Sequence, residues 1–390
     1  MLIKFFLSKK FQNKKIIKKK DKRIKEIFKE VLGQKSQIIN SLSKNFSYSY
    51  KIKQLKKYKS SHNYRVIGMG GSILGTQAIY DFLRHKIKKK FLFVNNLKNN
   101  QEEEKKKFIN LIVSKSGNTI ETIVNLNVIV KKNDKNIFIT ENKKNYLQTL
   151  AKKLKGEIIE HNNFIGGRFS VLSEVGMLPA ELMGLSPSKF KQLNSLIKNK
   201  YFFNSLIKDV ASTYFLLKKN KFNSVILNYD EKSNSLFNWY QQLVAESLGK
   251  QKKGLLPVIS SMPRDNHSIM QLYLDGPQNN FFTFFYVHDE EAKKIKNDKI
   301  LSSHKFLKNK KISDIIYAQK KATENVFNKK NIPFRSFEIM RRDERALGEL
   351  FSFFILEIIL LGKLLSINPF DQPAVELIKK ETNKILVKKR

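Results

Sequence analysis

The sequence has no cysteine among its 390 residues, few acidic residues and no long uninterrupted apolar run. The absence of cysteine excludes disulfides and thiol chemistry. The most apolar stretch, 351–365, contains Glu357 and Lys363 and is shorter than a bilayer span. The N-terminus lacks the apolar core and the cleavage site of a signal peptide. We therefore expect a soluble, cytoplasmic protein with no membrane partner.

The shortage of acidic residues leaves a large positive charge. Against 75 Lys and Arg there are 34 Asp and Glu, which gives a formal net charge of +41 and a pI near 10.0. Such a charge is typical of nucleic-acid-binding proteins, because lysine and arginine neutralise phosphates. Here the lysines run from Lys4 to Lys389, without zinc-finger spacing, an RNP-like aromatic strand or an arginine-rich arm. A lysine-rich surface explains the charge better, and we predict no nucleic-acid partner.

Short apolar runs alternate with helix-length segments along most of the chain. Apolar runs flanked by polar residues or glycine are typical of buried strands, and their alternation with helices predicts parallel sheets covered by helices. The expected strands lie at 66–67, 91–94, 111–113, 137–139, 225–227, 255–259 and 281–285, and the expected helices at 73–86, 119–131, 187–219, 236–248 and from about 345 to the end.

The alternating pattern occurs twice, which predicts two α/β domains in tandem, each with a parallel sheet between layers of helices. We place a basic helical segment packed on the body at 1–45. A first domain, which binds phosphate, is expected at 46–190, and a second domain with a C-terminal helical extension at 191–390. Ligands of such sheets bind beyond the carboxyl ends of the strands, where the motifs below fall.

A glycine loop follows the first expected strand in VIGMGGSILG, residues 66–75. It does not match a dinucleotide-binding loop, because Ile73 replaces the third glycine and the next strand ends in asparagines at 95–96 instead of an acid. The lysine of an NTP-binding loop is absent as well. What remains is a turn with Ser72 at the start of a helix, which fits either a generic anion cradle or a simple strand-to-helix connection.

The segment SKSGNTIET, residues 114–122, brings three hydroxyl groups to the end of another expected strand. Ser114, Ser116 and Thr119 precede a helix, and hydroxyls with free N–H groups at a helix N-terminus suit a compact, doubly charged phosphate. An ordinary helix cap would need only one of them. Three hydroxyls beside the glycine loop therefore favour a phosphate site.

Four further side chains are suited to acid–base chemistry. Arg168 follows a glycine pair in GGRFS, and Glu246 in AESLGK stands at the edge of an apolar helix face, where a carboxylate can serve as a general base. His267 in NHSIMQL and Lys379 in FDQPAVELIK are candidate proton donors. Taken singly, each is as typical of an ordinary surface ion pair or surface charge.

Together these motifs, in this order, closely resemble the phosphoglucose isomerase family. The matching segments are GMGGS, SKSGNTIET, GGRFSVLSEVG, AESLGK, NHSIMQL and FDQPAVELIK, which cover nearly the whole chain except its first 45 or so residues. GGRFS and FDQPAVELIK are specific to the family, whereas the glycine loop and SKSGNT occur more widely in sugar-isomerase (SIS) domains. The resemblance implies two SIS-type αβα sandwiches and a homodimer with the catalytic cleft between the domains.

The resemblance also implies an activity: reversible isomerisation of glucose 6-phosphate and fructose 6-phosphate, through ring opening and a cis-enediolate, in glycolysis and gluconeogenesis. It implies no metal and no other cofactor. Glu246 would move the proton between C2 and C1, Arg168 would stabilise the enediolate, and His267 (from the partner subunit) and Lys379 would open the ring. The substrate-binding residues would be Gly71, Ser72, Ser114, Lys115, Ser116, Thr119 and Gln372.

Three positions depart from the family pattern. Glu174 stands where proline or a small residue is usual, Ala374 where glycine is common, and Ser116 where threonine is frequent, although Ser116 keeps the hydroxyl. Two rival functions stay open at this stage: a bifunctional phosphoglucose/phosphomannose isomerase, and a non-catalytic SIS protein that senses sugar phosphates. A glutamine-dependent sugar aminotransferase is excluded, because it needs a nucleophilic cysteine.

Overall fold

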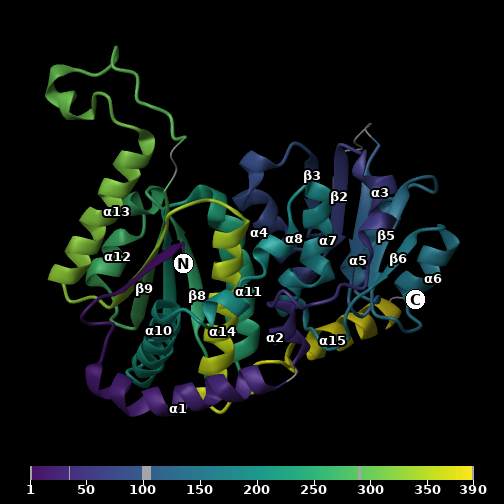
Figure 1. The fold of residues 1–390 in the computed structure, drawn as a ribbon, viewed down its shortest axis with the longest axis horizontal. Coiled ribbons are helices and arrows are strands. Elements are labelled where there is room, and N and C mark those ends of the chain that lie inside the picture. Colours follow the sequence, from purple (N-terminus) through teal and green to yellow (C-terminus); the bar gives the residue numbers. More distant parts are fainter. Residues whose placement is uncertain (1, 35, 99–106, 289–290, 389–390) are drawn as a thin grey trace.

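The chain folds around two five-stranded sheets, seen at the left and the right of Figure 1. The computed structural model describes residues 2–34, 36–98, 107–288 and 291–388. The first sheet has the order β3-β2-β4-β5-β6 and the second the order β1-β10-β9-β7-β8. The strands are β1 (Ile3–Leu7), β2 (Asn63–Gly68), β3 (Lys90–Val94), β4 (Ile109–Val113), β5 (Lys135–Thr140), β6 (Glu157–Glu160), β7 (Asn223–Asn228), β8 (Leu256–Ser261), β9 (Asn280–Val287) and β10 (Phe334–Ile339).

Every pair of strands in the first sheet is parallel. β4 is buried along its whole length, as expected for a continuous apolar run with helices on both faces. β2 and β4 are neighbours, with Gly68 opposite Val113. The helices of this half are α3 (Ile52–Lys59), α4 (Leu74–Phe82), α5 (Ile120–Ile129), α6 (Tyr146–Lys153) and α7 (Glu174–Met183).

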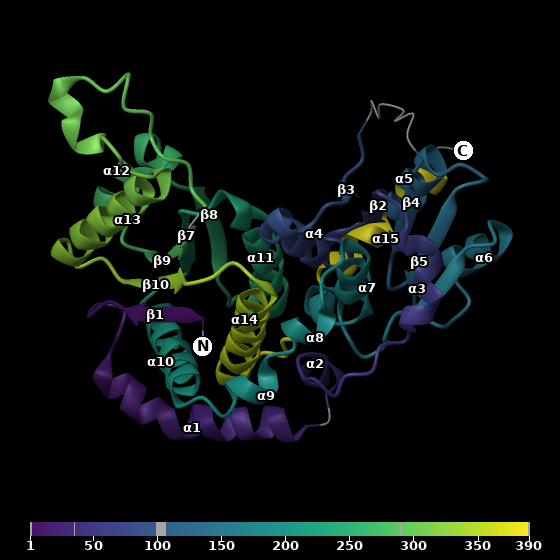
Figure 2. The same cartoon turned by 45° about the horizontal axis from the view of Figure 1, so that its top comes forward.

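The second sheet is parallel except at one edge, where β1 pairs antiparallel with β10. Helix α1 (Lys14–Gly33) then turns its apolar face, which includes Ile24 and Phe28, toward the body of the protein below α10 (Figure 2). The other helices of this half are α10 (Lys200–Lys218), α11 (Asn234–Leu248), α12 (Met270–Asp275), α13 (Ile312–Lys329) and α14 (Glu344–Leu364).

The expected α/β class with parallel sheets is confirmed, and a strand forms at each of the seven predicted places. Sequence reasoning did not find β1, β6 and β10. The expectation of a purely helical N-terminus is wrong for Ile3–Leu7, because this apolar run completes an edge of the second sheet. The C-terminal region divides as its prolines predict, into α14 and α15 (Val375–Lys388).

The two halves share one continuous apolar core. One cluster of buried side chains includes Val66 and Leu111 of the first sheet and Phe281 and Phe337 of the second. Helices α11 and α14 lie between the halves (Figure 2). The proposed domain boundary near residue 190 therefore stays a prediction. The short helices α2 (Gln37–Ser41), α8 (Pro187–Phe190) and α9 (Leu193–Leu196) also pack near this junction.

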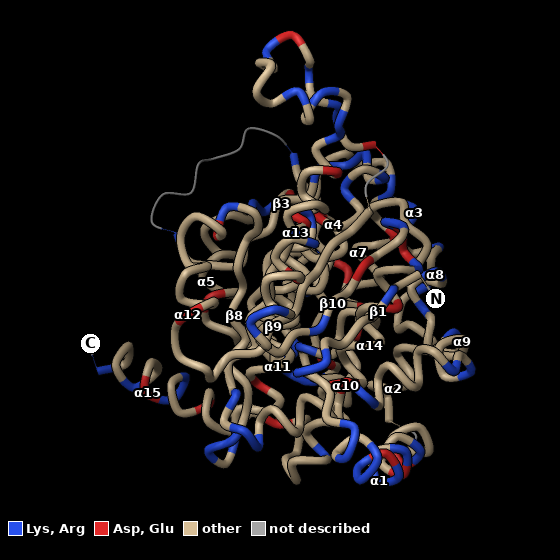
Figure 3. Tube along the Cα trace, turned by 90° about the vertical axis from the view of Figure 1, so that its left-hand side faces the viewer, with Lys and Arg blue, Asp and Glu red and all other residues tan. Residues whose placement is uncertain are grey.

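Lysine and arginine recur along much of the trace in Figure 3, and α1 is especially rich in them. The helices α4, α5, α7 and α11 contain neither. Although α14 is long and almost wholly buried, none of the helices in the described part of the chain has the length and apolarity needed to cross a bilayer.

A buried ionic cluster ties the second sheet to the helices on one of its faces. The guanidinium of Arg335 on β10 donates to Asp209 on α10 and to Glu357 on α14, both at 2.6 Å. It also donates to Tyr240 and Thr283, each at 2.9 Å. Two carboxylates share one guanidinium, and all three side chains are fully buried. Burial therefore raises the pKa of Asp209, an effect that Glu357 reinforces and Arg335 opposes.

We predict that Asp209→Asn changes how stability depends on pH. Folded wild type keeps a proton on Asp209 at pH values where the unfolded chain, with an aspartate pKa of about 3.9, has lost it. The free energy of unfolding therefore falls as the pH rises from that value through the raised pKa, and the variant lacks this fall. Urea unfolding between about pH 5 and about pH 9 should show the variant gaining on wild type as the pH rises.

The matched control is Asp275→Asn, which changes an exposed aspartate at the end of α12. Its stability should follow the wild-type pH dependence. A parallel pH dependence for Asp209→Asn and wild type would contradict the raised pKa.

Candidate functional site

The candidate site begins at the carboxyl ends of β2 and β4. In the sheet, β2 lies between β3 and β4, so the chain leaves β2 toward one side to form β3 and then crosses to the other side of β2 to form β4. A crevice opens where the connections diverge in this way, and ligands of open parallel sheets bind there. The glycine loop follows β2, and the loop of residues 114–119 follows β4, so the sheet itself places the two predicted phosphate loops side by side.

The glycine loop forms a 3₁₀ turn, Gly70–Ser72, that touches the segment carrying Arg168. A Cβ added to Gly71 would lie 2.1 Å from the carbonyl carbon of Gly167 and 2.5 Å from the backbone nitrogen of Arg168. No side chain fits in that space. Gly71 therefore lets the glycine loop and the 3₁₀ helix η3 (Gly167–Leu172) meet backbone to backbone.

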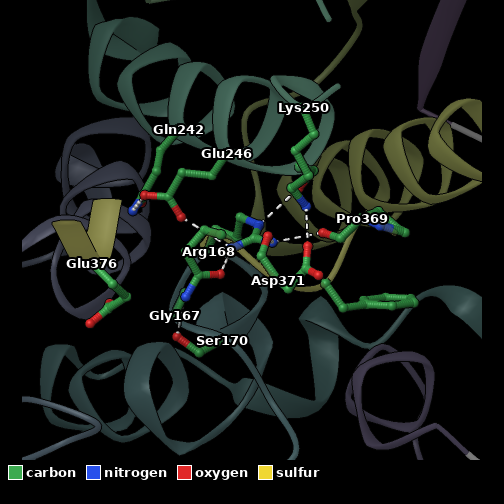
Figure 4. A network of polar contacts seen from close by, with 12 residues as sticks. Gly167, Arg168, Ser170, Gln242, Glu246, Lys250, Pro369, Asp371 and Glu376 are labelled. Carbon is green, nitrogen blue, oxygen red and sulfur yellow. Dashed lines mark hydrogen bonds and ion pairs between the residues drawn. The ribbon is translucent and has the colours of Figure 1, made fainter. Parts of the chain in front are cut away.

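Arg168 is buried, with 2% of its surface exposed, and its three nitrogens donate to five acceptors. Nη1 donates to Glu246 Oε2 at 3.1 Å and to Gln372 Oε1 at 2.7 Å (Figure 4). Nε donates to Ser247 Oγ at 2.8 Å. Nη2 donates to the backbone carbonyls of Pro369 and Asp371, at 2.7 and 3.1 Å.

The electrostatics of Arg168 follow from this environment. Burial lowers its pKa from the ordinary arginine value, and the charge and hydrogen bond of Glu246 oppose that shift. The cation is thus held in a site that exposes little of it to water, with the carboxylate of Glu246 as an ionic partner at 3.1 Å. A cation fixed in this way costs no reorganisation when negative charge develops beside it.

Glu246 lies in the last turn of α11, and its side chain is 28% exposed. Oε2 accepts from Arg168, while Oε1 accepts from Gln242 Nε2 at 2.8 Å, one helical turn earlier. Both oxygens are therefore oriented, but the carboxylate remains accessible. Such a group can accept and return a proton at a fixed position.

The hydroxyl-rich loop of residues 114–119 is ordered by its own contacts. Ser114 Oγ and Thr119 Oγ1 lie 2.9 Å apart, and Ser116 Oγ accepts from the N–H of Asn118 at 3.3 Å. Lys115 turns its ammonium away from these hydroxyls: Nζ donates to the carbonyl of Asn163 at 2.7 Å and lies 3.5 Å from Glu141 Oε1. The ammonium of Lys115 is therefore engaged outside the group of hydroxyls formed by Ser114, Ser116 and Thr119.

Two predicted catalytic residues do not meet this network within the single chain. His267 is exposed in a 3₁₀ turn, Arg264–His267, which follows β8. Lys379 is exposed on α15, where its ammonium donates to Glu376 at 2.6 Å. Neither has a hydrogen bond or ion pair with Arg168 or Glu246 among the described residues. Their roles stay predictions.

Sequence reasoning missed several partners of Arg168 and Glu246. Gln242 and Ser247 flank Glu246 on α11, and a four-residue spacing between Gln242 and Glu246 was the available signal. Trp239, the one tryptophan, donates its indole N–H to the Arg168 carbonyl at 3.1 Å. The backbone carbonyls of Pro369 and Asp371 could not be predicted as partners of Arg168 from the sequence, because every residue has a carbonyl.

Comparison with known proteins gives one consistent result. The sequence model of the family "Phosphoglucose isomerase" matches residues 12–390. The glucose-6-phosphate isomerase of Methanocaldococcus jannaschii is 35% identical over 358 residues, which cover 84% of this chain and 85% of that protein.

Two solved structures share the fold. A hypothetical protein from Thermus thermophilus aligns with a TM-score of 0.83 at 22% identity, covering 98% of this chain and 100% of its own. A glucose-6-phosphate isomerase from Chlamydia trachomatis aligns with a TM-score of 0.72 at 17% identity, covering 95% and 85%.

We predict that Gly71→Ala destabilises the protein, because the new methyl group meets backbone atoms of Gly167 and Arg168 that cannot rotate away. Overpacking of this kind costs about 1–3 kcal/mol, which urea unfolding would measure. Gly166→Ala is the matched control in the neighbouring loop: its Cβ would meet only the Phe169 ring, at 3.7 Å. Equal stability of the two variants would contradict the close approach of the loops.

Proposed function

The chain belongs to the phosphoglucose isomerase family, and from this membership and the geometry of the site we propose how each residue serves the reaction. The protein is an aldose–ketose isomerase that interconverts glucose 6-phosphate and fructose 6-phosphate. The observation that carries the residue assignments is the contact between buried Arg168 and accessible Glu246, next to two phosphate-type loops.

We propose that the phosphate group binds between the glycine loop and the hydroxyl-rich loop. Ser72 on the first loop, and Ser114, Ser116 and Thr119 on the second, would donate hydroxyl hydrogens, with N–H groups near Gly71, Lys115 and the start of α5. Binding energy gained there holds the sugar carbons near Glu246, so that the reaction becomes effectively unimolecular.

Glu246 acts as the base in this proposal. Its carboxylate removes the proton from C2 of the open-chain aldose, which leaves an enediolate with negative charge on oxygen, and returns the proton to C1. Gln242 fixes Oε1 through the 2.8 Å hydrogen bond. Arg168 supplies the positive charge that stabilises the enediolate, and Gln372, bonded to Nη1, lines the same position.

Ring opening requires proton transfer at the ring oxygen and the C1 hydroxyl. We assign it to His267 and Lys379 on the strength of the family resemblance. Because exposed His267 does not reach Glu246 in its own chain, the proposal includes a homodimer in which each His267 enters the partner's site. Lys379 would have to leave Glu376, to which it donates on α15.

We predict that Glu246→Gln lowers kcat by about 10²–10⁴-fold, because the amide cannot accept the C2 proton. Gln keeps an oxygen that can accept from Arg168, so inhibition by inorganic phosphate should stay near the wild-type value. A coupled assay with fructose 6-phosphate measures both quantities. Glu231→Gln, an exposed acid just before α11, is the control and should keep wild-type turnover.

A second prediction tests the shared site. If His267 serves the partner's Glu246, mixing and refolding His267→Ala with Glu246→Gln creates mixed dimers that contain one intact site. With random pairing in a two-fold dimer, the mixture should recover about a quarter of wild-type activity, although each variant alone is inactive. Activity that stays at the level of the separate variants would show that each chain uses its own His267.

A further inference from the structure

Glu174 is a buried carboxylate that contacts the segment of chain leading to Arg168. It is the first residue of α7 and is 1% exposed. Oε1 accepts the backbone N–H of Asn162 at 2.6 Å. Asn162 belongs to the segment 162–167, which connects the end of β6 to Arg168.

The segment 162–167 is held at further points. Asn162 organises its start, since its side-chain oxygen accepts from the N–H of Phe164 at 2.9 Å. Lys115, from the hydroxyl-rich loop, donates to the carbonyl of Asn163 at 2.7 Å. At its end, Gly167 lies against Gly71 of the glycine loop. Both phosphate loops therefore touch the chain that carries Arg168.

The far end of η3 is fixed as well. Lys191 is 3% exposed, and its ammonium donates to the carbonyls of Leu172 and Ser41. The rings of Phe46 and Tyr48 lie 4.8 and 4.9 Å from that ammonium. Burial lowers the pKa of Lys191 to about 7, and Glu174 opposes the shift. Glu174 thus supplies negative charge near the buried cation as well as an acceptor for Asn162.

We propose that Glu174 is a positioning residue for the isomerisation: by holding the N–H of Asn162 it fixes the segment 162–167, and through it the alignment of Arg168 with Glu246. Arg168 must make five hydrogen bonds at once, so a small displacement of its backbone weakens several of them together. Misplacement of about 1 Å at a catalytic group can cost about a hundredfold in rate. This inference rests on the function proposed above.

The alternative is that Glu174 only stabilises α7, since a carboxylate in the first helical turn is favourable there whatever lies beyond. Glu181 provides the comparison. It lies on the same helix and is 14% exposed in its side chain, and it pairs with Lys59 at 2.6 Å. Within the described parts of the chain, Glu181 makes no hydrogen bond or ion pair with the segment 162–167.

The test compares Glu174→Ala, Glu174→Gln and Glu181→Ala in two readouts. With fructose 6-phosphate, Glu174→Ala should lower kcat about tenfold or more and leave KM within about twofold, because the phosphate loops keep their donors. Glu174→Gln should retain most of the wild-type kcat, since the amide oxygen accepts the same N–H. Glu181→Ala should lower the Tm and leave kcat unchanged.

The second readout does not depend on activity. Trp239 is the single tryptophan, is fully buried and bonds to the Arg168 carbonyl, so its fluorescence reports on the backbone at Arg168. Glu174→Ala should make Trp239 more accessible to acrylamide quenching than Glu181→Ala does. If wild type failed to turn over fructose 6-phosphate, the proposed function would be wrong, and the quenching comparison would still decide the positioning role.

Wild-type kcat and wild-type quenching in folded Glu174→Ala would overturn the proposal, as would equal losses in Glu181→Ala. If Glu174→Ala does not fold, Glu174→Asp replaces it. That variant keeps a carboxylate in the first turn of α7, but its shorter side chain does not reach the N–H of Asn162. It must then show the same loss of kcat without a change in KM, and unchanged kcat would refute the role.

Discussion

The hydrogen bonds of Arg168 are the interaction on which the site depends. One guanidinium joins three parts of the chain that are far apart in sequence: η3 of the first half, the end of α11, and the loop between α14 and α15. A buried cation is costly unless its donors are satisfied. The hydrogen bonds to Glu246 and Gln372 therefore stabilise the buried Arg168 in the folded chain. In the proposed mechanism the same arrangement places a cation beside the base. The contacts that stabilise Arg168 are thus the same ones that the proposed reaction uses.

The glycine loop has a packing role in addition to its proposed role in phosphate binding. Its pattern fitted either an anion cradle or a simple strand-to-helix turn, and the absent third glycine argued against a dinucleotide. The space around Gly71 shows a further requirement, because the loop also forms the wall against which Gly167 and Arg168 rest. In the proposed binding mode this loop contacts both the phosphate and the segment that carries Arg168, so phosphate binding and the alignment of Arg168 would be coupled. Binding energy from the phosphate would then contribute to catalysis at the sugar carbons.

The sequence revealed those parts of the molecule that obey local rules. Apolar runs such as 111–113 marked buried strands, and the prolines after residue 368 marked the break between α14 and α15. The parts that escaped depend on distant partners. The run Ile3–Leu7 forms a strand by pairing with the edge strand β10, more than 300 residues away in the sequence. The residues next to Ile3–Leu7 contain no signal for that pairing. Lys379 and His267 could be identified by motif, but the single chain does not carry either one to Glu246.

The hydroxyl-rich loop of residues 114–119 contains only one lysine, although the chain has a net charge of +41. Any attraction that this charge exerts on a sugar phosphate should weaken with salt. At the loop itself the one lysine, Lys115, is turned to Asn163 and Glu141, so the proposed phosphate site relies on neutral hydroxyls and N–H groups. Neutral donors of fixed geometry select the shape of a phosphate monoester, whereas a free ammonium would bind any anion. An enzyme that must release its product as readily as it binds its substrate, in both directions, is better served by the neutral donors.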